Sequence, residues 1–192
     1  MIFEQTLTIY ESVISVTTLA VLILFWKFFF FRKKQLEILS ILPSAIVIGT
    51  GLSGKSSLTK AITESEIYSS FLGDGLGISR FIHGDRKMQI IDANLTLENI
   101  KKLKKLNLKS IVYVFDVSSS LDSLKNQIKD FEDFRKTFKK IKHLVVLNKV
   151  DIANKQTLKE IKKIFRDVYE VSAKTNEGLY EFRKSVISSL SI

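Results

Sequence analysis

The apolar positions of the chain follow two alternating spacings over most of its length. Six short apolar runs bounded by polar or glycine-containing segments predict buried strands, at residues 45–48, 79–82, 88–91, 111–115, 144–147 and 168–171. Between the runs, apolar residues recur every three or four positions, which predicts helices with one buried face. The clearest stripes are Leu121, Leu124, Ile128, Phe131, Phe134 and Phe138, and near the C-terminus Leu179, Phe182, Val186 and Leu190. Strands that alternate with helices predict a parallel α/β sheet, with ligands at the carboxyl ends of its strands.

A different pattern precedes these elements. Residues 13–31 read VISVTTLAVLILFWKFFFF, interrupted only by Lys27. Such a run is close to the length that crosses a hydrocarbon core of about 30 Å. Glu4 and Glu11 ahead of the run, and aromatic residues at its end, fit a cleavable signal peptide poorly. We therefore predict a transmembrane helix at 13–31 after a short non-cytoplasmic N-terminus at 1–12, in preference to a buried core helix.

Charge gives this predicted span an orientation. Lys27, Arg32, Lys33 and Lys34 lie at its C-terminal end, whereas the N-terminal flank holds no lysine or arginine. The positive-inside rule then places the rest of the chain in the cytoplasm. The chain has no cysteine for a disulfide or a lipid anchor, and Ile2 replaces the glycine that myristoylation needs. Residues 32–42 form a basic linker that reaches at most about 35 Å, so a single domain at 43–192 stays near the bilayer.

The first chemical motif follows the first strand of that domain. Residues 49–56 read GTGLSGKS and match the phosphate-binding pattern G-x-x-x-x-G-K-[ST] between a strand and a helix. Its glycines are expected to let backbone N–H groups meet phosphate oxygens at the positive end of the helix. Lys55 is expected to reach the β- and γ-phosphates, and the Ser56 hydroxyl to bind Mg²⁺. The predicted phosphate-binding residues are Gly49, Gly51, Leu52, Ser53, Gly54, Lys55, Ser56 and Ser57.

The second motif, N-K-x-D at residues 148–151, predicts which base is bound. The Asp151 carboxylate can accept from both N1–H and the exocyclic amine of guanine, a donor pair that adenine lacks. Asn148 can bond the acceptor edge of the base, and the Lys149 stem can lie along its face. A third motif, Ser172-Ala173-Lys174, can direct the Ala173 N–H at the guanine carbonyl. In this order the motifs predict binding of GTP and GDP, with Mg²⁺.

From about Pro43 to the C-terminus, these motifs resemble those of Ras-like small GTPases. The resemblance implies a six-stranded, mostly parallel sheet flanked by helices. The N-terminal span and residues 111–119, IVYVFDVSS, also resemble the beta subunit of the signal recognition particle receptor and its Arf and Sar relatives. That likeness implies a GTP-binding subunit in the endoplasmic reticulum membrane. Such a subunit holds the receptor's alpha subunit for co-translational targeting, near the ribosome and translocon.

The switch regions depart from the Ras-like pattern. Asp92 can hold Mg²⁺ through water, but Leu95 replaces the glycine of D-x-x-G and Thr96 follows it, where a water-orienting residue is expected. A side chain at Leu95 restricts the backbone. The first-switch threonine has no clear counterpart; Ser69, Ser70 and Ser79 are candidates, near a glycine-rich segment at 73–77 that suggests a mobile loop. We expect slow hydrolysis and a long-lived GTP-bound adaptor, because water positioning is much of what these proteins contribute.

Two other functions stay open at this point. One is an Arf- or Sar-type regulatory GTPase in membrane traffic, and the other is a nucleotide-free membrane scaffold. His83 and His143 are expected to be strand-edge residues and not catalytic bases. The net charge is +10. Its lysines are spread over several helices without stacking aromatics, which favours solvated helix faces over lipid or RNA binding and gives no reason to expect DNA binding.

Overall fold

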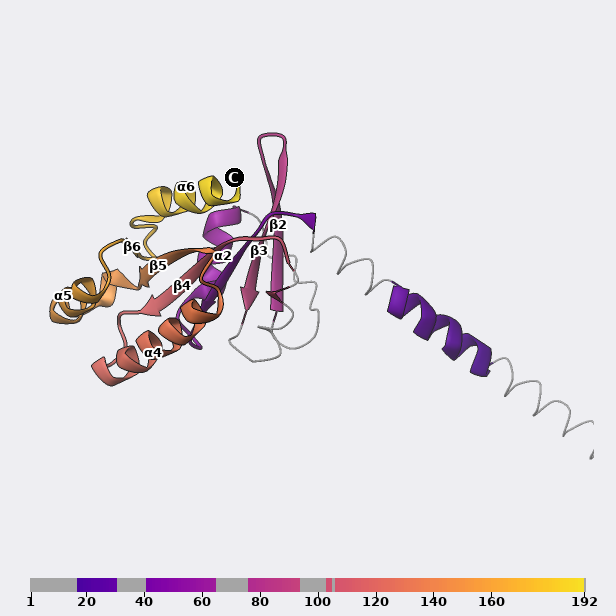
Figure 1. Ribbon diagram of the computed structural model, residues 1–192, viewed down its shortest axis with the longest axis horizontal. Coiled ribbons are helices and arrows are strands. Elements are labelled where there is room, and N and C mark those ends of the chain that lie inside the picture. Colours follow the sequence, from indigo (N-terminus) through magenta and orange to yellow (C-terminus); the bar gives the residue numbers. More distant parts are fainter. Residues whose placement is uncertain (1–16, 31–40, 65–75, 94–102, 105, 192) are drawn as a thin grey trace, which may run out of the picture. The chain divides into compact units, whose positions relative to one another are not determined.

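The computed structural model describes residues 17–30, 41–64, 76–93, 103–104 and 106–191. The chain divides into two compact units, Met1–Leu39 and Ser40–Ile192, which are described separately. The second unit contains one six-stranded sheet in the order β2-β3-β1-β4-β5-β6 (Figure 1). The strands are β1 (Ser44–Gly49), β2 (Leu76–His83), β3 (Arg86–Ala93), β4 (Leu108–Asp116), β5 (Lys142–Asn148) and β6 (Val168–Val171). The helices are α2 (Lys55–Thr63), α4 (Leu121–Thr137), the 3₁₀ helix η1 (Val150–Ile152), α5 (Lys155–Ile164) and α6 (Leu179–Leu190).

The sheet is parallel except at one edge. β1 pairs in parallel with β3 and β4, β4 with β5, and β5 with β6, whereas β2 pairs antiparallel with β3. The predicted α/β fold with a six-stranded, mostly parallel sheet flanked by helices is therefore confirmed. Because β1, β3, β4, β5 and β6 run the same way, the loops that follow β1, β5 and β6 meet at one end of the sheet.

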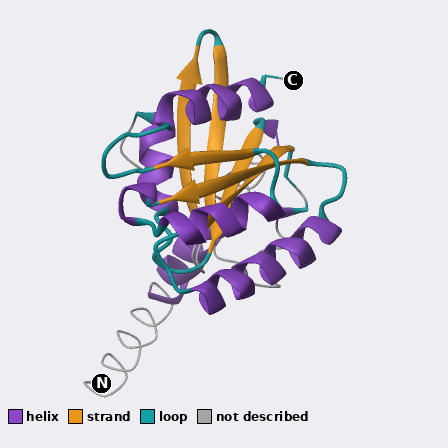
Figure 2. Cartoon of the chain, turned by 90° about the vertical axis from the view of Figure 1, so that its left-hand side faces the viewer, coloured by secondary structure: helices purple, strands orange, loops and turns teal. Residues whose placement is uncertain are grey.

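Helices cover both faces of the sheet (Figure 2). Strand alternation sends Val47, Val112 and Val146 into a buried cluster with Leu58 of α2 and Phe182 of α6. The opposite face carries large aromatic side chains: Tyr113 and Phe115 pack against Phe131 of α4, with ring centroids 5.2 and 5.9 Å from it. Because the strands bury side chains on both faces, they read as continuous apolar runs.

The α4 stripe differs from its prediction at two positions. Leu124, Phe131, Phe134 and Phe138 are buried as expected, but Leu121 is half exposed and Ile128 is only partly buried. Gln127 is buried instead. Its amide bonds backbone and side-chain groups at the end of β4, and no apolar side chain could replace it there.

Two smaller predictions concern the start of β2 and the positions of the two histidines. Leu76 and Gly77 already belong to β2, so the expected loop at 73–77 is wrong for these two residues, while 73–75 lie outside the described residues. His83 ends β2 and His143 is the second residue of β5, which confirms their strand-edge positions. The His143 imidazole lies 3.1 Å from the Phe138 carbonyl oxygen. Burial is the main cause that lowers the pKa of His143.

In the N-terminal unit, residues 17–30 are helical. Its large apolar side chains, from Leu19 to Phe30, are between 49% and 68% exposed. Among the helices that the structure describes, none is both long enough and apolar enough to cross a membrane. The predicted span also includes 13–16 and 31, which lie outside the described residues, as do 1–12 and 32–40 of the predicted flanks. The span and its linker stay predictions.

Candidate nucleotide-binding site

The phosphate loop connects β1 to α2 at the carboxyl end of the sheet. Gly54 is the N-cap of α2, in a left-handed conformation with φ 89°, and no side chain caps the helix. The first turn of α2 contains no acidic residue. Its backbone N–H groups are therefore open to an anion, and the helix dipole favours negative charge there. This arrangement suits phosphate oxygens.

Lys55 lies back over the loop that precedes it. Its Nζ donates to the Thr50 carbonyl oxygen at 2.7 Å, and the residue is buried. Burial lowers the pKa of Lys55, and the nearby negative charge of Asp92 opposes this shift. A bound phosphate would compensate the buried ammonium, which fits the role predicted from the sequence.

Leu52 and not Gly51 adopts the left-handed backbone inside the loop. Leu52 has φ 61°, and its side chain is 91% exposed. A Cβ added at Gly51 would meet no heavy atom within 4 Å. Neither the backbone conformation nor the surrounding protein atoms therefore require glycine at position 51, and its contact with phosphate stays a prediction. At Gly49 the need is close approach, because a Cβ there would lie 2.4 Å from the Val114 carbonyl oxygen.

The two predicted metal ligands are in contact. Ser56, at the start of α2, donates from Oγ to Oδ2 of Asp92 in β3 at 2.6 Å. Hydroxyl and carboxylate oxygens are ligands that Mg²⁺ accepts, and this ion usually keeps several waters and adds phosphate oxygens. Among the described residues there is no cluster of three or more His, Cys, Asp or Glu. The site fits a Mg²⁺ held by Ser56 and, through water, by Asp92; this ion would neutralise phosphate charge.

Asn148 joins three loops that are far apart in the sequence. Its Nδ2 donates to the Ser53 carbonyl oxygen at 2.8 Å, and its Oδ1 accepts from the Ala173 N–H at 3.2 Å. The side chain is buried, so these bonds form away from water. We call this arrangement the Asn148 clamp. It brings the phosphate loop, the N-K-x-D motif and the S-A-K motif together at one end of the sheet.

The clamp changes the roles expected for two groups. The Ala173 N–H, predicted to donate to guanine, here donates to Asn148. The Asn148 oxygen is also engaged, so only the second Nδ2 hydrogen remains for the acceptor edge of a base. Both residues lie at the base end of the site, but in this structure their hydrogen bonds hold the phosphate loop and the S-A-K turn against the N-K-x-D motif.

The remaining base-binding candidates lie around the clamp. Asp151 is exposed and lies in η1. Lys149 is the N-cap of η1, and its backbone is left-handed with φ 67°. Ser172 is buried, and its Oγ accepts from the Thr175 N–H at 3.2 Å, which shapes the turn containing Lys174. The exposed Asp151 carboxylate is free to read the base edge.

Lys149 has a partner that the sequence did not indicate. Its Nζ lies 2.6 Å from Oδ2 of Asp116, the last residue of β4. Burial on its own would raise the pKa of Asp116, but hydrogen bonds from Lys149 and Ser118 and the lysine charge outweigh it, so the pKa lies below its ordinary value. This pair fixes the direction of the Lys149 stem, which was predicted to cover the base.

Gln127 of α4 holds the end of β4 and the loop after it, next to the Lys149–Asp116 pair. Its Oε1 accepts from the Asp116 N–H at 3.0 Å, and its Nε2 donates to the Ser119 Oγ at 3.1 Å. Its backbone carbonyl accepts from the Tyr113 hydroxyl at 3.0 Å. A lone glutamine within the phenylalanine-striped helix was the one available signal of this support.

We expect Asp116→Ala to lower the free energy of unfolding by about 1–2 kcal/mol and to weaken GDP binding several-fold. The loss follows because Lys149 would keep its charge without its partner. The contribution is present above the ordinary carboxyl pKa of 3.8 and disappears as the pH falls through the lowered folded value. Denaturant titration and GDP titration would measure both effects.

The matched control is Asp122→Ala on α4. Asp122 pairs with Lys125 at 3.2 Å, but both side chains are highly exposed. Exposed pairs contribute about 0–1 kcal/mol. Equal effects of the two substitutions would contradict a positioning role for Asp116.

The switch candidates are mostly outside the described residues. Leu95, Thr96, Ser69 and Ser70 all lie there. Ser79 is fully buried within β2, opposite Ile90 and two positions beyond Gly77, which pairs with Asp92. A buried mid-strand hydroxyl cannot reach a metal at the phosphate loop, so Ser79 is wrong as a candidate for the first-switch ligand.

One comparison with known proteins bears on this site. Residues 97–151 match the family model described as Nucleolar GTP-binding protein 1 (NOG1). The match covers well under half of the chain and includes β4, α4, β5 and the N-K-x-D motif. It indicates a GTP-binding protein, and therefore GTP and GDP as ligands. No curated protein matches the chain.

Proposed function

We propose that this chain is the membrane-anchored GTP-binding subunit of the signal recognition particle receptor, the beta subunit that it resembles. In this role it would hold the receptor's alpha subunit at the endoplasmic reticulum membrane, with its nucleotide domain in the cytoplasm and Mg²⁺ beside the nucleotide. GTP binding rests on the family match and the site; the receptor role rests on the N-terminal segment and the resemblance.

The Asn148 clamp is the observation on which the nucleotide-binding part of the proposal rests. The hydrogen bonds from Asn148 to Ser53 and from Ala173 to Asn148 join the phosphate motif to both base motifs. Three short patterns that could each occur by chance thus form one site. A scaffold without nucleotide would not need these loops in contact.

The apolar helix at 17–30 supports the proposed membrane anchor. Apolar side chains lie on all its sides and are exposed. A helix that is apolar all round is stable when lipid or protein covers it. The flanking charges Arg32, Lys33 and Lys34 give the cytoplasmic orientation.

Carbonate extraction tests the anchor. The full chain and a fragment starting at Ser40 would be synthesised with endoplasmic reticulum microsomes and extracted at alkaline pH. We expect the full chain to stay with the membranes and the fragment to leave them, because only the full chain holds residues 13–31. Protease added outside the microsomes should digest the nucleotide domain. Release of the full chain would contradict the anchor.

A single-turnover hydrolysis assay separates the adaptor from a regulatory GTPase. Without a partner we expect a rate constant of about 10⁻³ s⁻¹ or less, comparable with unassisted Ras. The GTP form, and not the GDP form, should capture the N-terminal domain of a receptor alpha subunit. A rate constant of about 1 s⁻¹ would contradict the adaptor and favour the cycling alternative.

A further inference from the structure

We propose that the end of the Ser40–Ile192 unit opposite the nucleotide site is a docking face for an anionic lipid bilayer. The face is formed by Leu42, Arg86, Lys87, Asn107 and Lys109, and we call it the basal face. The inference goes beyond nucleotide binding and rests on the proposed membrane anchor for its location. Nucleotide binding does not use this surface, and we assign lipid headgroups as its binding partner.

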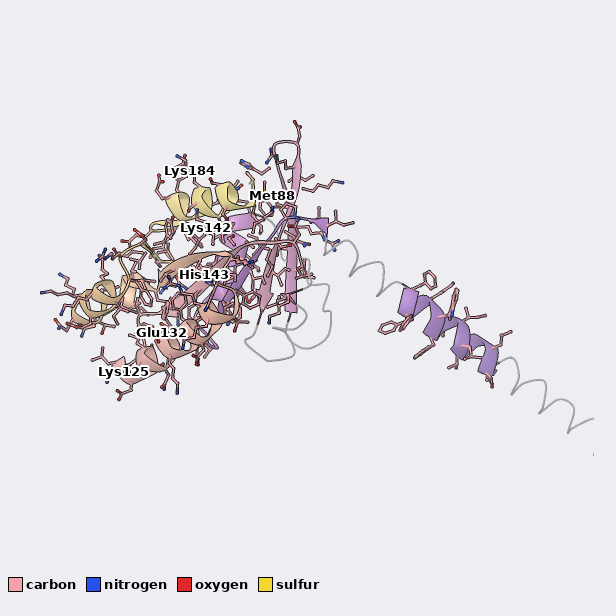
Figure 3. All side chains as sticks on the ribbon, in the orientation of Figure 1. Met88, Lys125, Glu132, Lys142, His143 and Lys184 are labelled. Carbon is pink, nitrogen blue, oxygen red and sulfur yellow. The ribbon has the colours of Figure 1, made fainter. Side chains whose placement is uncertain are left out.

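The strand register sets the basal face apart from the nucleotide site. β1 begins at Ser44, opposite Gln89 of β3. The β2–β3 hairpin continues for three further residue pairs, from Phe81↔Met88 to His83↔Arg86. At about 3.3 Å per residue, the hairpin projects about 10 Å past the start of β1. The projection is visible in both ribbon views, and its side chains stand clear of the rest of the domain in Figure 3.

The hairpin forms one wall of an open pocket at this end. The pocket has a volume of about 380 Å³ and is lined by Arg86, Lys87, Lys109, Asn107, Leu42 and Pro43, among others. Nη1 of Arg86 donates to the Ser191 carbonyl oxygen at 2.5 Å, which joins the hairpin to the end of α6. The pocket is thus an open basic surface built from four parts of the chain.

Charge and exposed apolar groups both favour a bilayer as the occupant. Arg86, Lys87, Lys109 and the neighbouring Lys142 have no ion-pair partner among the residues that the structure describes, and Asp85 is the one carboxylate on the hairpin tip. Ile41 and Ile82 at this end are 70% and 68% exposed. Cations near a membrane surface are attracted to anionic lipids, and exposed apolar side chains enter the interface.

The chain enters the domain at this same face. Nδ2 of Asn107 donates to the Ile41 carbonyl oxygen at 3.1 Å, and the Ser44 N–H donates to the Asn107 carbonyl oxygen at 3.0 Å. From the end of the predicted span at Phe31 to Ile41, the chain can reach at most about 35 Å. If residues 13–31 span the bilayer as proposed, a tether attached at the basal face limits how far that face can lie from the headgroups.

RNA is the other polyanion that could meet a basic surface. The residues that line the pocket include no aromatic side chain on which a base could stack. A bilayer needs no stacking group and uses the exposed isoleucines. With the basal face on the membrane, the nucleotide site at the other end of the strands would point into the cytoplasm, where a partner can reach it.

Vesicle cosedimentation of a fragment comprising Ser40–Ile192 tests the proposal. The fragment has its own core on both sides of the sheet, so it should fold without the N-terminal unit. We expect it to bind phosphatidylcholine vesicles containing about one-third phosphatidylserine and to bind pure phosphatidylcholine at least about tenfold more weakly. Raising the salt concentration should weaken binding to the anionic vesicles.

Two triple variants with equal net charge locate the binding surface. Arg86→Ser, Lys87→Ser and Lys109→Ser together should lower vesicle affinity at least about tenfold, whereas Lys129→Ser, Lys155→Ser and Lys159→Ser on α4 and α5 should change it less than about twofold. Unchanged GDP affinity of both variants would show that each is folded.

Three results would overturn the proposal: no binding of the unaltered fragment to anionic vesicles, equal effects of the two triple variants, or tighter binding of polyuridylate than of vesicles through the basal residues. Because the fragment lacks residues 13–31, its failure is distinguishable from failure of the anchor in carbonate extraction.

Discussion

Replacing Asp151 by asparagine is expected to weaken GTP binding by about 100-fold and to make xanthosine triphosphate the better ligand. A carboxylate accepts from both N1–H and the exocyclic amine of guanine. An asparagine amide keeps one acceptor and presents a donor where the amine stands. Xanthine carries a carbonyl group in place of that amine and accepts the new donor. Asp151 lies exposed in η1 beside the Asn148 clamp, so the change should alter the base preference without altering the fold.

Competition of GTP and of xanthosine triphosphate against a fluorescent GDP analogue measures this change in base preference directly. Asp167→Asn is the matched control, because Asp167 is also exposed but precedes β6, at the end of the sheet away from the site. It should bind GTP as the unaltered protein does. If Asp151→Asn retained GTP affinity and gained none for xanthosine triphosphate, Asp151 would not read the base.

The second large effect is expected from Gly54→Ala, which should lower GDP affinity by at least about 100-fold. A Cβ at Gly54 would lie 2.2 Å from Nδ2 of Asn148, and the backbone there has φ 89°. The substitution therefore strains the start of α2 and displaces the Asn148 amide. Displacement breaks its bonds to Ser53 and Ala173, so the phosphate and base motifs lose their connection.

Gly51→Ala in the same loop provides the control. An added Cβ at Gly51 meets nothing within 4 Å, so its GDP affinity should stay within about threefold of the unaltered value. Calorimetric titration of both variants with GDP, and their circular dichroism spectra, would separate lost binding from lost folding. Similar affinities for the two variants would contradict the importance of the Asn148 clamp.

The fold could be predicted because its strands are buried on both faces. The runs at β1, β4 and β5 are continuously apolar, and helical stripes lie between them, so alternation and fold class follow from spacing alone. Strand ends were less predictable: β2 begins at Leu76, within a segment whose glycines suggested a loop. Pairing with β3 supplies backbone hydrogen bonds that overcome this local preference.

The site was predictable in its motifs but not in its internal bonds. The spacing of Lys55, Ser56, Asn148 and Asp151 identifies a nucleotide site, yet the bond from Asn148 to Ser53 joins residues 95 positions apart. The pairing of Lys149 with Asp116 and the burial of Gln127 likewise depend on which strands become neighbours. The left-handed Leu52 could not be foreseen, because the pattern contains a glycine beside it.

The most direct test of the central claim compares GTP and ATP binding to the purified protein in the presence of Mg²⁺. With Asp151 at the base edge and the Asn148 clamp intact, we predict that GTP binds at least about 1,000-fold more tightly than ATP, because adenine does not offer the Asp151 carboxylate the N1–H and amine pair that guanine offers. Equal affinities, tighter binding of ATP, or no binding of either nucleotide would contradict a guanine-nucleotide site.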